Sequence, residues 1–168
     1  MWLTIPVKRE FPVKINQVEI AVQEWQRKHW LSINVNYSKT PFWSKHLKFF
    51  EDLYKKEFTR LVEVNLPIIE WIAEQLNVKR KMILSSQLNL DESLRSTDLL
   101  IEIVKKVGGT VYLSGISGRK YLEEDKFKIN GMELRYQEFQ HPVYNQAYPD
   151  FIKNLSSIDY IFNTGKSL

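Results

Sequence analysis

A segment rich in glycine and serine, residues 112–121, has the composition of an anion-binding loop at the end of a predicted strand. Gly115 and Gly118 would let backbone N–H groups approach a phosphate closely, and Ser114 and Ser117 add hydroxyl donors. Two bases, Arg119 and Lys120, follow and can add positive charge, and Tyr121 ends the segment. If Ser117 caps a helix, the positive end of that helix also faces the ligand. The spacing is not that of a Walker loop, and a plain tight turn with a serine cap is the alternative.

A second segment with chemical potential begins at His141 and Pro142 in a predicted loop. Imidazole titrates near neutral pH, so His141 is a candidate general base or acid. Tyr144 and Gln146 follow closely and could orient a substrate. The alternative is a loop histidine that only hydrogen-bonds to the backbone.

Aromatic and basic residues alternate in a third segment, residues 25–30. Helical spacing places Trp25 and His29 on one face, with Arg27 and Lys28 directed elsewhere. Such a segment can stack on a base or sugar and hold phosphate. In the alternative, the tryptophans belong to the core and the bases to a solvated rim. His46 has no patterned polar neighbours and is expected at the surface.

Composition excludes several other chemistries. The chain has no cysteine, which excludes a disulfide framework, a cysteine nucleophile and an Fe–S site. The three histidines lack metal-ligand spacing, so no metal is expected, and no cofactor can be named. No G-x-S-x-G motif marks a serine nucleophile. The net charge of +4 is too small to indicate nucleic acid, and no apolar run is long enough for a membrane span.

The elements that must position these residues follow from periodicity. Apolar spacing predicts four helices, at residues 22–37, 42–54, 59–76 and from 156 to a stop at 165. Within the third, Thr59 is a possible N-cap, and Pro67 predicts either a kink or a late start. In the last, Ser156 and Asp159 resemble a capping box.

A βαβ unit is predicted from a strand at residues 81–86, a helix at 97–107 and a strand at 110–113. Further strands are expected at residues 2–7 and 132–139. The fold class is therefore α/β, a mostly parallel sheet with helices on its faces and a helical insertion. With no linker or repeat, residues 1–168 are expected to form a single domain.

The order and spacing of many residues resemble the WbqC-like family of bacterial proteins. The matching positions are residues 2–7, Trp25, Lys28, His29, Tyr37, residues 39–42, Asn65, Gly108, Gly109, residues 112–115, Ser117, Gly118, Tyr121, Leu122, His141, Pro142, Tyr144, Gln146, Phe151, residues 156–159 and residues 162–165. Members usually begin with a further N-terminal segment that carries a Gln-Pro-x-Tyr-x-Pro-Trp-x-Gly-Tyr-Phe-like motif. This chain is expected to lack that segment.

The resemblance implies a cytoplasmic protein of O-antigen or other surface-polysaccharide (lipopolysaccharide) biosynthesis. Its expected activity is that of a transferase that N-acylates or glycylates a nucleotide-linked amino sugar. His141 would then be the base, Tyr144, Gln146 and Tyr121 would position the sugar, and the loop from Ser114 would hold the phosphates. Arg27, Lys28 and His29 are candidates for the donor side.

The competing hypothesis is a non-catalytic module that binds a nucleotide sugar or a partner protein, inactive through loss of the N-terminal segment. An open sheet edge and many aromatic residues also make a homodimer reasonable. A role in nucleic-acid binding is the least supported.

Overall fold

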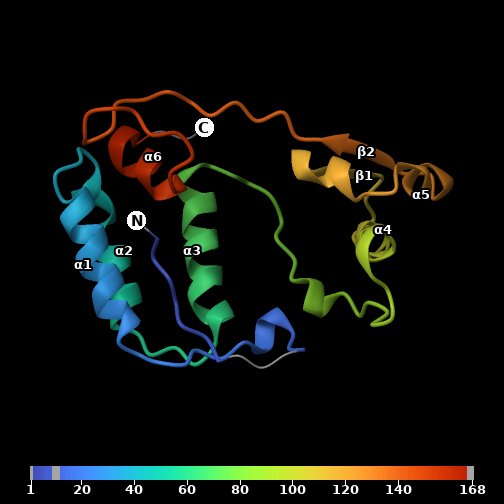
Figure 1. Ribbon diagram of the computed structural model, residues 1–168, viewed down its shortest axis with the longest axis horizontal. Coiled ribbons are helices and arrows are strands. Elements are labelled where there is room, and N and C mark those ends of the chain that lie inside the picture. Colours follow the sequence, from blue (N-terminus) through green and yellow to red (C-terminus); the bar gives the residue numbers. More distant parts are fainter. Residues whose placement is uncertain (1, 9–11, 166–168) are drawn as a thin grey trace. The chain divides into compact units, whose positions relative to one another are not determined.

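The chain folds into two compact units. The computed structural model describes residues 2–8 and 12–165. The first unit comprises Met1–Arg80 and His141–Leu168, and the second comprises Lys81–Gln140 (Figure 1). Helices predominate, and the described residues contain one parallel pair of strands. The expected α/β class is confirmed at this coarse level.

Helices form the first unit. They are α1 (Trp25–Tyr37), α2 (Trp43–Lys55), α3 (Leu61–Gln75) and α6 (Ser157–Thr164), with a short 3₁₀ turn at Ile15–Gln17. The turn between α1 and α2 is closed by buried Thr40, whose hydroxyl donates to the Tyr37 carbonyl at 2.7 Å. All four helices predicted for this unit are present, within a few residues of their expected bounds.

The start of α3 differs from the prediction. Arg60, not Thr59, occupies the N-cap position, and the helix runs through Pro67 without a late start. The Glu63 carboxylate accepts hydrogen bonds from the backbone N–H groups of Thr59 and Arg60, at 2.9 and 3.1 Å. The first turn is thus capped by an acidic side chain from within the helix.

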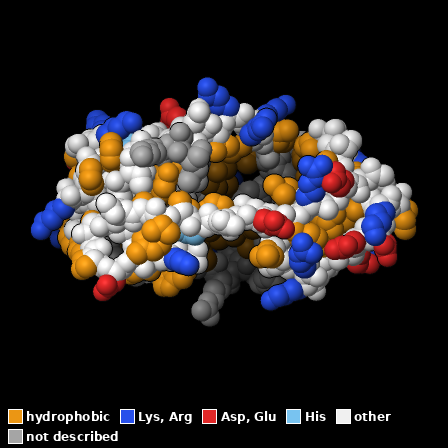
Figure 2. Space-filling view, turned by 90° about the horizontal axis from the view of Figure 1, so that it is seen from above, with side chains coloured by type: hydrophobic (Ala, Val, Ile, Leu, Met, Phe, Trp, Pro, Cys, Tyr) orange, Lys and Arg blue, Asp and Glu red, His pale blue; other side chains and the backbone are white. Residues whose placement is uncertain are grey.

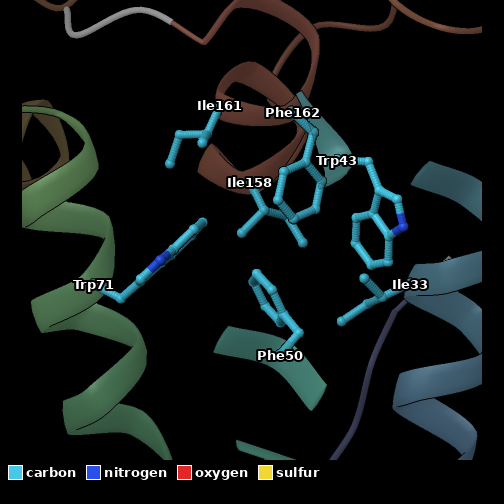
Figure 3. Packing of buried hydrophobic residues seen from close by; sticks show 7 residues of the cluster. All are labelled: Ile33, Trp43, Phe50, Trp71, Ile158, Ile161 and Phe162. Carbon is cyan, nitrogen blue, oxygen red and sulfur yellow. The ribbon is translucent and has the colours of Figure 1, made fainter. Parts of the chain in front are cut away.

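Aromatic side chains fill the core of the first unit (Figure 3). Phe50 and Phe162 are almost completely buried, and the Trp71 ring meets Phe50 edge-on at 5.0 Å. The expectation that His46 lies at the surface is wrong, since it is 4% exposed and its ring is 5.3 Å from Trp71. On α2 it occupies the same stripe as Trp43 and Phe50, which faces the core.

The strand expected at residues 2–7 is absent. These residues form no regular element, and only Val7 makes an isolated antiparallel bridge, to Ile20. Trp2 is 94% exposed. A residue type favours a strand mainly through packing against a neighbouring strand. Residues 2–7 have no such neighbour, so their β-rich composition does not produce a strand.

The second unit is a small mixed domain. It contains a 3₁₀ turn at Ser85–Gln87, α4 (Ser96–Lys106), β1 (Val111–Ser114), the 3₁₀ helix η3 (Ile116–Lys120), α5 (Glu124–Ile129) and β2 (Glu133–Tyr136). β1 and β2 are parallel, with Val111 opposite Glu133 and Ser114 opposite Tyr136. Buried residues of α4, α5 and the connecting segments form its core: Ile101, Val104, Leu122, Phe127 and Met132.

The βαβ unit is real but lies one element later than predicted. Residues 81–86 form no strand, so the unit consists of β1, α5 and β2, whereas α4 precedes it. Within the described residues the sheet has two strands only, and is smaller than the mostly parallel sheet that we expected. Tyr112 stacks on Phe127 of α5, whereas Val111 and Leu113 on the opposite face are exposed.

Candidate functional site

His141 begins the return of the chain into the first unit, and its tautomer is set by a local contact. Its Nδ1 lies 2.8 Å from the carbonyl oxygen of Pro142. A carbonyl can only accept, so Nδ1 carries a proton in this contact. The ring also lies parallel to that of Tyr144, 6.1 Å away, and 5.9 Å from the ring of Phe151. The half-buried imidazole therefore has a defined orientation.

Tyr144 and Gln146 share one acceptor, the Asp159 carboxylate on α6. The Tyr144 hydroxyl donates to Oδ2 at 2.8 Å, and Nε2 of Gln146 donates to the same oxygen at 3.0 Å. The Gln146 amide also bridges the chain at Ile152, accepting from its N–H at 2.8 Å and donating to its carbonyl at 3.0 Å. The structure thus brings together the three residues predicted as catalytic, His141, Tyr144 and Gln146.

Asp159 is the residue that sequence reasoning missed. It is 5% exposed, and its side chain does not complete a capping box, because Ser156 makes no side-chain cap bond. A usable signal was present, since the buried residues of α6 include Ile158, Ile161 and Phe162. A carboxylate on the apolar stripe of a helix requires internal donors.

The environment of this carboxylate raises the pKa values of two neighbouring tyrosines. Burial, reinforced by the hydrogen bond to Asp159, raises the pKa of Tyr144 to about 12. Burial and the Asp159 charge likewise hold the pKa of Tyr37 well above its ordinary value. Both phenols therefore remain protonated donors around the carboxylate at neutral pH.

The predicted anion-binding loop lies in the second unit, and packing explains two of its residues. Ser114 is 4% exposed, and its hydroxyl donates to the Gly115 carbonyl at 3.0 Å. A Cβ on Gly118 would lie 2.1 Å from Ser114 Oγ, so only glycine fits at that position. Ser117 lies inside η3, and Gly115 occupies the N-cap position, so the condition that Ser117 caps a helix is not met.

Other residues of the loop face solvent. Gly115, Ser117, Arg119 and Tyr121 are exposed. The Arg119 guanidinium lies 4.2 Å from the centre of the Tyr136 ring, which orients it through a cation–π contact. The phosphate-binding role of the loop stays a prediction, carried by these exposed groups.

The α1 candidates are divided between core and surface. Trp25 and His29 are buried, and Nε2 of His29 donates to the Thr4 carbonyl at 3.1 Å. Burial lowers the pKa of His29, so the ring is held neutral. Arg27 and Lys28 are exposed. Arg27 and Lys28 are therefore still accessible to a ligand. The His29 ring is packed against the Trp25 ring, with 5.0 Å between the ring centres.

The structure bears in two further ways on what the protein could bind. Among residues 2–8 and 12–165, no group of three His, Asp or Glu side chains is arranged to hold a metal ion. None of the helices formed by these residues is long and apolar enough to cross a membrane. Figure 2 shows basic and acidic side chains interspersed on one face.

Comparison with known proteins gives two matches. The model of the WbqC-like protein family matches residues 1–168. The chain is also similar to the uncharacterized protein Rv1507c of Mycobacterium tuberculosis, with 26% identity over 168 residues, 98% of this chain and 72% of that protein. No solved structure matches the chain significantly.

Proposed function

Because this chain belongs to the WbqC-like protein family, we propose that it acts in bacterial surface-glycan biosynthesis and N-acylates or aminoacylates a nucleotide-linked amino sugar. The observation that carries the proposal is the orientation of His141 by the Pro142 carbonyl, next to Tyr144 and Gln146 on a buried carboxylate. An oriented imidazole beside oriented hydrogen-bonding groups suits proton removal from an amine.

The reaction requires only a proton transfer and an acyl transfer. The amine nitrogen of the sugar attacks the acyl carbon of an activated acyl or aminoacyl donor, and a new C–N bond forms. The bond from the acyl carbon to the leaving group breaks, and the leaving group departs with the electron pair. Nε2 of His141 accepts the proton that the nitrogen loses and delivers it to the leaving group.

Neighbouring residues support this role for His141. Asp159 holds Tyr144 and Gln146 in place, so their positions do not depend on a bound substrate. Tyr144 remains protonated up to high pH, and its ring lies parallel to the imidazole. Asp159 is therefore a positioning residue, which acts through Tyr144 and Gln146.

The test uses the full chain, amino-sugar nucleotides and activated acyl donors, with mass spectrometry of the products. The sharpest variant is His141→Asn, because its amide can replace the Nδ1–H donor to Pro142 but supplies no basic Nε2. We expect His141→Asn to remain folded and to lose turnover by about 10²-fold or more. Tyr144→Phe should reduce turnover, whereas the exposed Tyr148→Phe serves as its matched control.

Two outcomes separate the hypotheses. Undiminished turnover by folded His141→Asn would contradict the assignment of the base. Saturable binding of an amino-sugar nucleotide without any product would favour the non-catalytic binding module.

The loop of the second unit is proposed to bind phosphate and is tested by itself. Arg119→Gln removes its oriented guanidinium, and the exposed Lys81→Gln removes a charge elsewhere in the same unit. We expect nucleotide phosphates to bind more weakly to Arg119→Gln than to Lys81→Gln. Equal affinities would remove the support for a phosphate site at the loop.

A further inference from the structure

A hollow of about 360 Å³ lies in the first unit, between α1 and α2. Its walls carry charged and aromatic side chains of both helices, Arg27, Trp30, Glu51, Tyr54 and Lys55. Its volume falls in the range of small-molecule sites. Arg27 and Trp30 lie ten and seven residues before Tyr37 on α1, so the hollow lies about 10–15 Å along the helix from Tyr37. It is therefore separate from the Asp159 cluster, which Tyr37 joins.

The charged groups around this hollow do not neutralise one another. The structure shows no ion pair, in the part of the chain that it describes, for Arg27, Glu51 or Lys55. Glu51 and Lys55 have the i,i+4 spacing that favours pairing, yet remain apart. Two cations and one carboxylate thus surround one hollow and are available to a ligand.

The two aromatic side chains in the walls, Trp30 and Tyr54, pack against buried tryptophans of the core. Trp30 stacks on buried Trp43 at 5.9 Å, and Tyr54 meets Trp25 edge-on at 6.1 Å. Among the described residues the Tyr54 hydroxyl has no hydrogen-bond partner, and burial raises its pKa to about 12, so it remains a donor. An indole and a phenol at these positions offer a flat apolar surface and a polar edge.

Two glutamine side chains that line the hollow, Gln23 and Gln26, connect the α1 region to the chain after α2. Nε2 of Gln23 donates to the Phe58 carbonyl at 2.8 Å, and Nε2 of Gln26 donates to the Lys56 carbonyl. These bonds tie the beginning of α1 to the chain that leaves α2. The backbone segments that carry the charged side chains are therefore joined before any ligand binds.

We infer that this hollow binds a small ligand that carries both an anionic and an ammonium group. Arg27 and Lys55 hold the anion, Glu51 holds the ammonium, and the apolar part of the ligand lies against Trp30. A purely anionic ligand would meet the Glu51 carboxylate, and a purely cationic one would meet two cations. The two chemical sources of such a ligand are an amino-sugar phosphate and a free amino acid. This inference does not depend on the reaction proposed for His141.

The experiment is a binding titration of the full chain, followed by tryptophan fluorescence and calorimetry. The probes are glucosamine 6-phosphate, N-acetylglucosamine 6-phosphate, which lacks the ammonium, glucosamine, which lacks the anion, and leucine. We expect glucosamine 6-phosphate or leucine to bind saturably. If glucosamine 6-phosphate is the probe that binds, we expect N-acetylglucosamine 6-phosphate and glucosamine, which each lack one charge, to bind about tenfold more weakly than it does.

Variants test the assignment of each charge. Arg27→Gln and Lys55→Gln should each weaken the better probe about tenfold, and Glu51→Gln should abolish any preference for a ligand with an ammonium group. Lys39→Gln and Glu70→Gln remove the same charges from exposed positions outside the hollow and should bind like the unmodified chain. Tight binding of leucine with these dependences would identify an amino acid as the source.

Three results would overturn the inference. The first is the absence of saturable binding by every probe. The second is equal affinity of Arg27→Gln and Lys39→Gln. The third is binding of the sugar phosphate that is indifferent to its amine. All three concern binding, so a lack of turnover in the His141 experiment leaves them unaffected.

Discussion

The Tyr144 hydroxyl donates a 2.8 Å hydrogen bond to Oδ2 of Asp159, fifteen residues further along the chain. Asp159 is nearly buried on α6, and among the described residues no basic side chain forms an ion pair with it. Its charge is therefore stabilised by hydrogen-bond donors alone, and these donors fix the segment that begins at His141.

Asp159→Asn should destabilise the first unit by about 1–3 kcal/mol. Tyr144 and Gln146 donate to the same oxygen, which an amide oxygen can replace, but the negative charge that strengthens both hydrogen bonds is lost. Urea denaturation measures the free energy of unfolding, and UV titration should show a lower pKa for Tyr144. The exposed Asp150→Asn is the control, and equal stability of the two variants would contradict the network.

The stability of the protein should fall as the pH drops below about 6.5. Burial lowers the pKa values of His29 and His46 from their ordinary value of 6.5, with Lys45 adding to the effect at His46. The unfolded chain therefore binds more protons than the folded chain in this range, so acid favours unfolding. Denaturation midpoints at a series of pH values measure the slope.

His46→Phe should reduce that slope. Nε2 of His46 is buried without a hydrogen-bond partner in the described part of the chain, and Phe fits the surrounding aromatic rings without a titrating group. Its free energy of unfolding should vary less between neutral and mildly acidic pH. A slope unchanged by the substitution would show that His46 does not contribute to it.

Gly118→Ala should destabilise the second unit by about 1–3 kcal/mol. The added methyl group would lie 2.1 Å from Ser114 Oγ and 2.9 Å from the Leu122 side chain. Gly115→Ala is the matched control, because no atom lies within 4 Å of its Cβ position and its backbone is extended. Hydrogen exchange of the β1 amides reports the difference, and equal protection in both variants would contradict the close packing.

Gly165→Ala should lower the stability of the protein more than Gly131→Ala does. Both glycines have positive φ, 61° and 68°, which alanine adopts at a cost of about 1 kcal/mol. Only at Gly165 would the methyl group also meet the Phe42 ring, at 2.4 Å. The melting temperatures of the two variants measure this difference, and a smaller loss at Gly165 would be inconsistent with the contact.

Local pattern was sufficient to predict the helices of the first unit and α4, but not the short helix α5. Apolar residues recur every three or four positions along α1, α2, α3 and α6, and this periodicity is a property of the segment itself. The parallel relation of β1 and β2 follows from the helix α5 that connects them, but the βαβ unit was predicted one element earlier, because α5 was not among the predicted helices. Strand pairing was harder to predict than the helices, because residues 2–7 and 81–86 have strand-like composition without a strand partner.

The candidate site depended on contacts that no local pattern contains. The sequence alone singled out His141, Tyr144 and Gln146 by residue type, but Asp159 resembled a helix cap and His46 a surface residue. Only the packing of α6 and α2 decided that both are buried. The physical reason is that burial and hydrogen-bond partners come from residues distant in the chain, whereas periodicity and capping preferences are set by near neighbours.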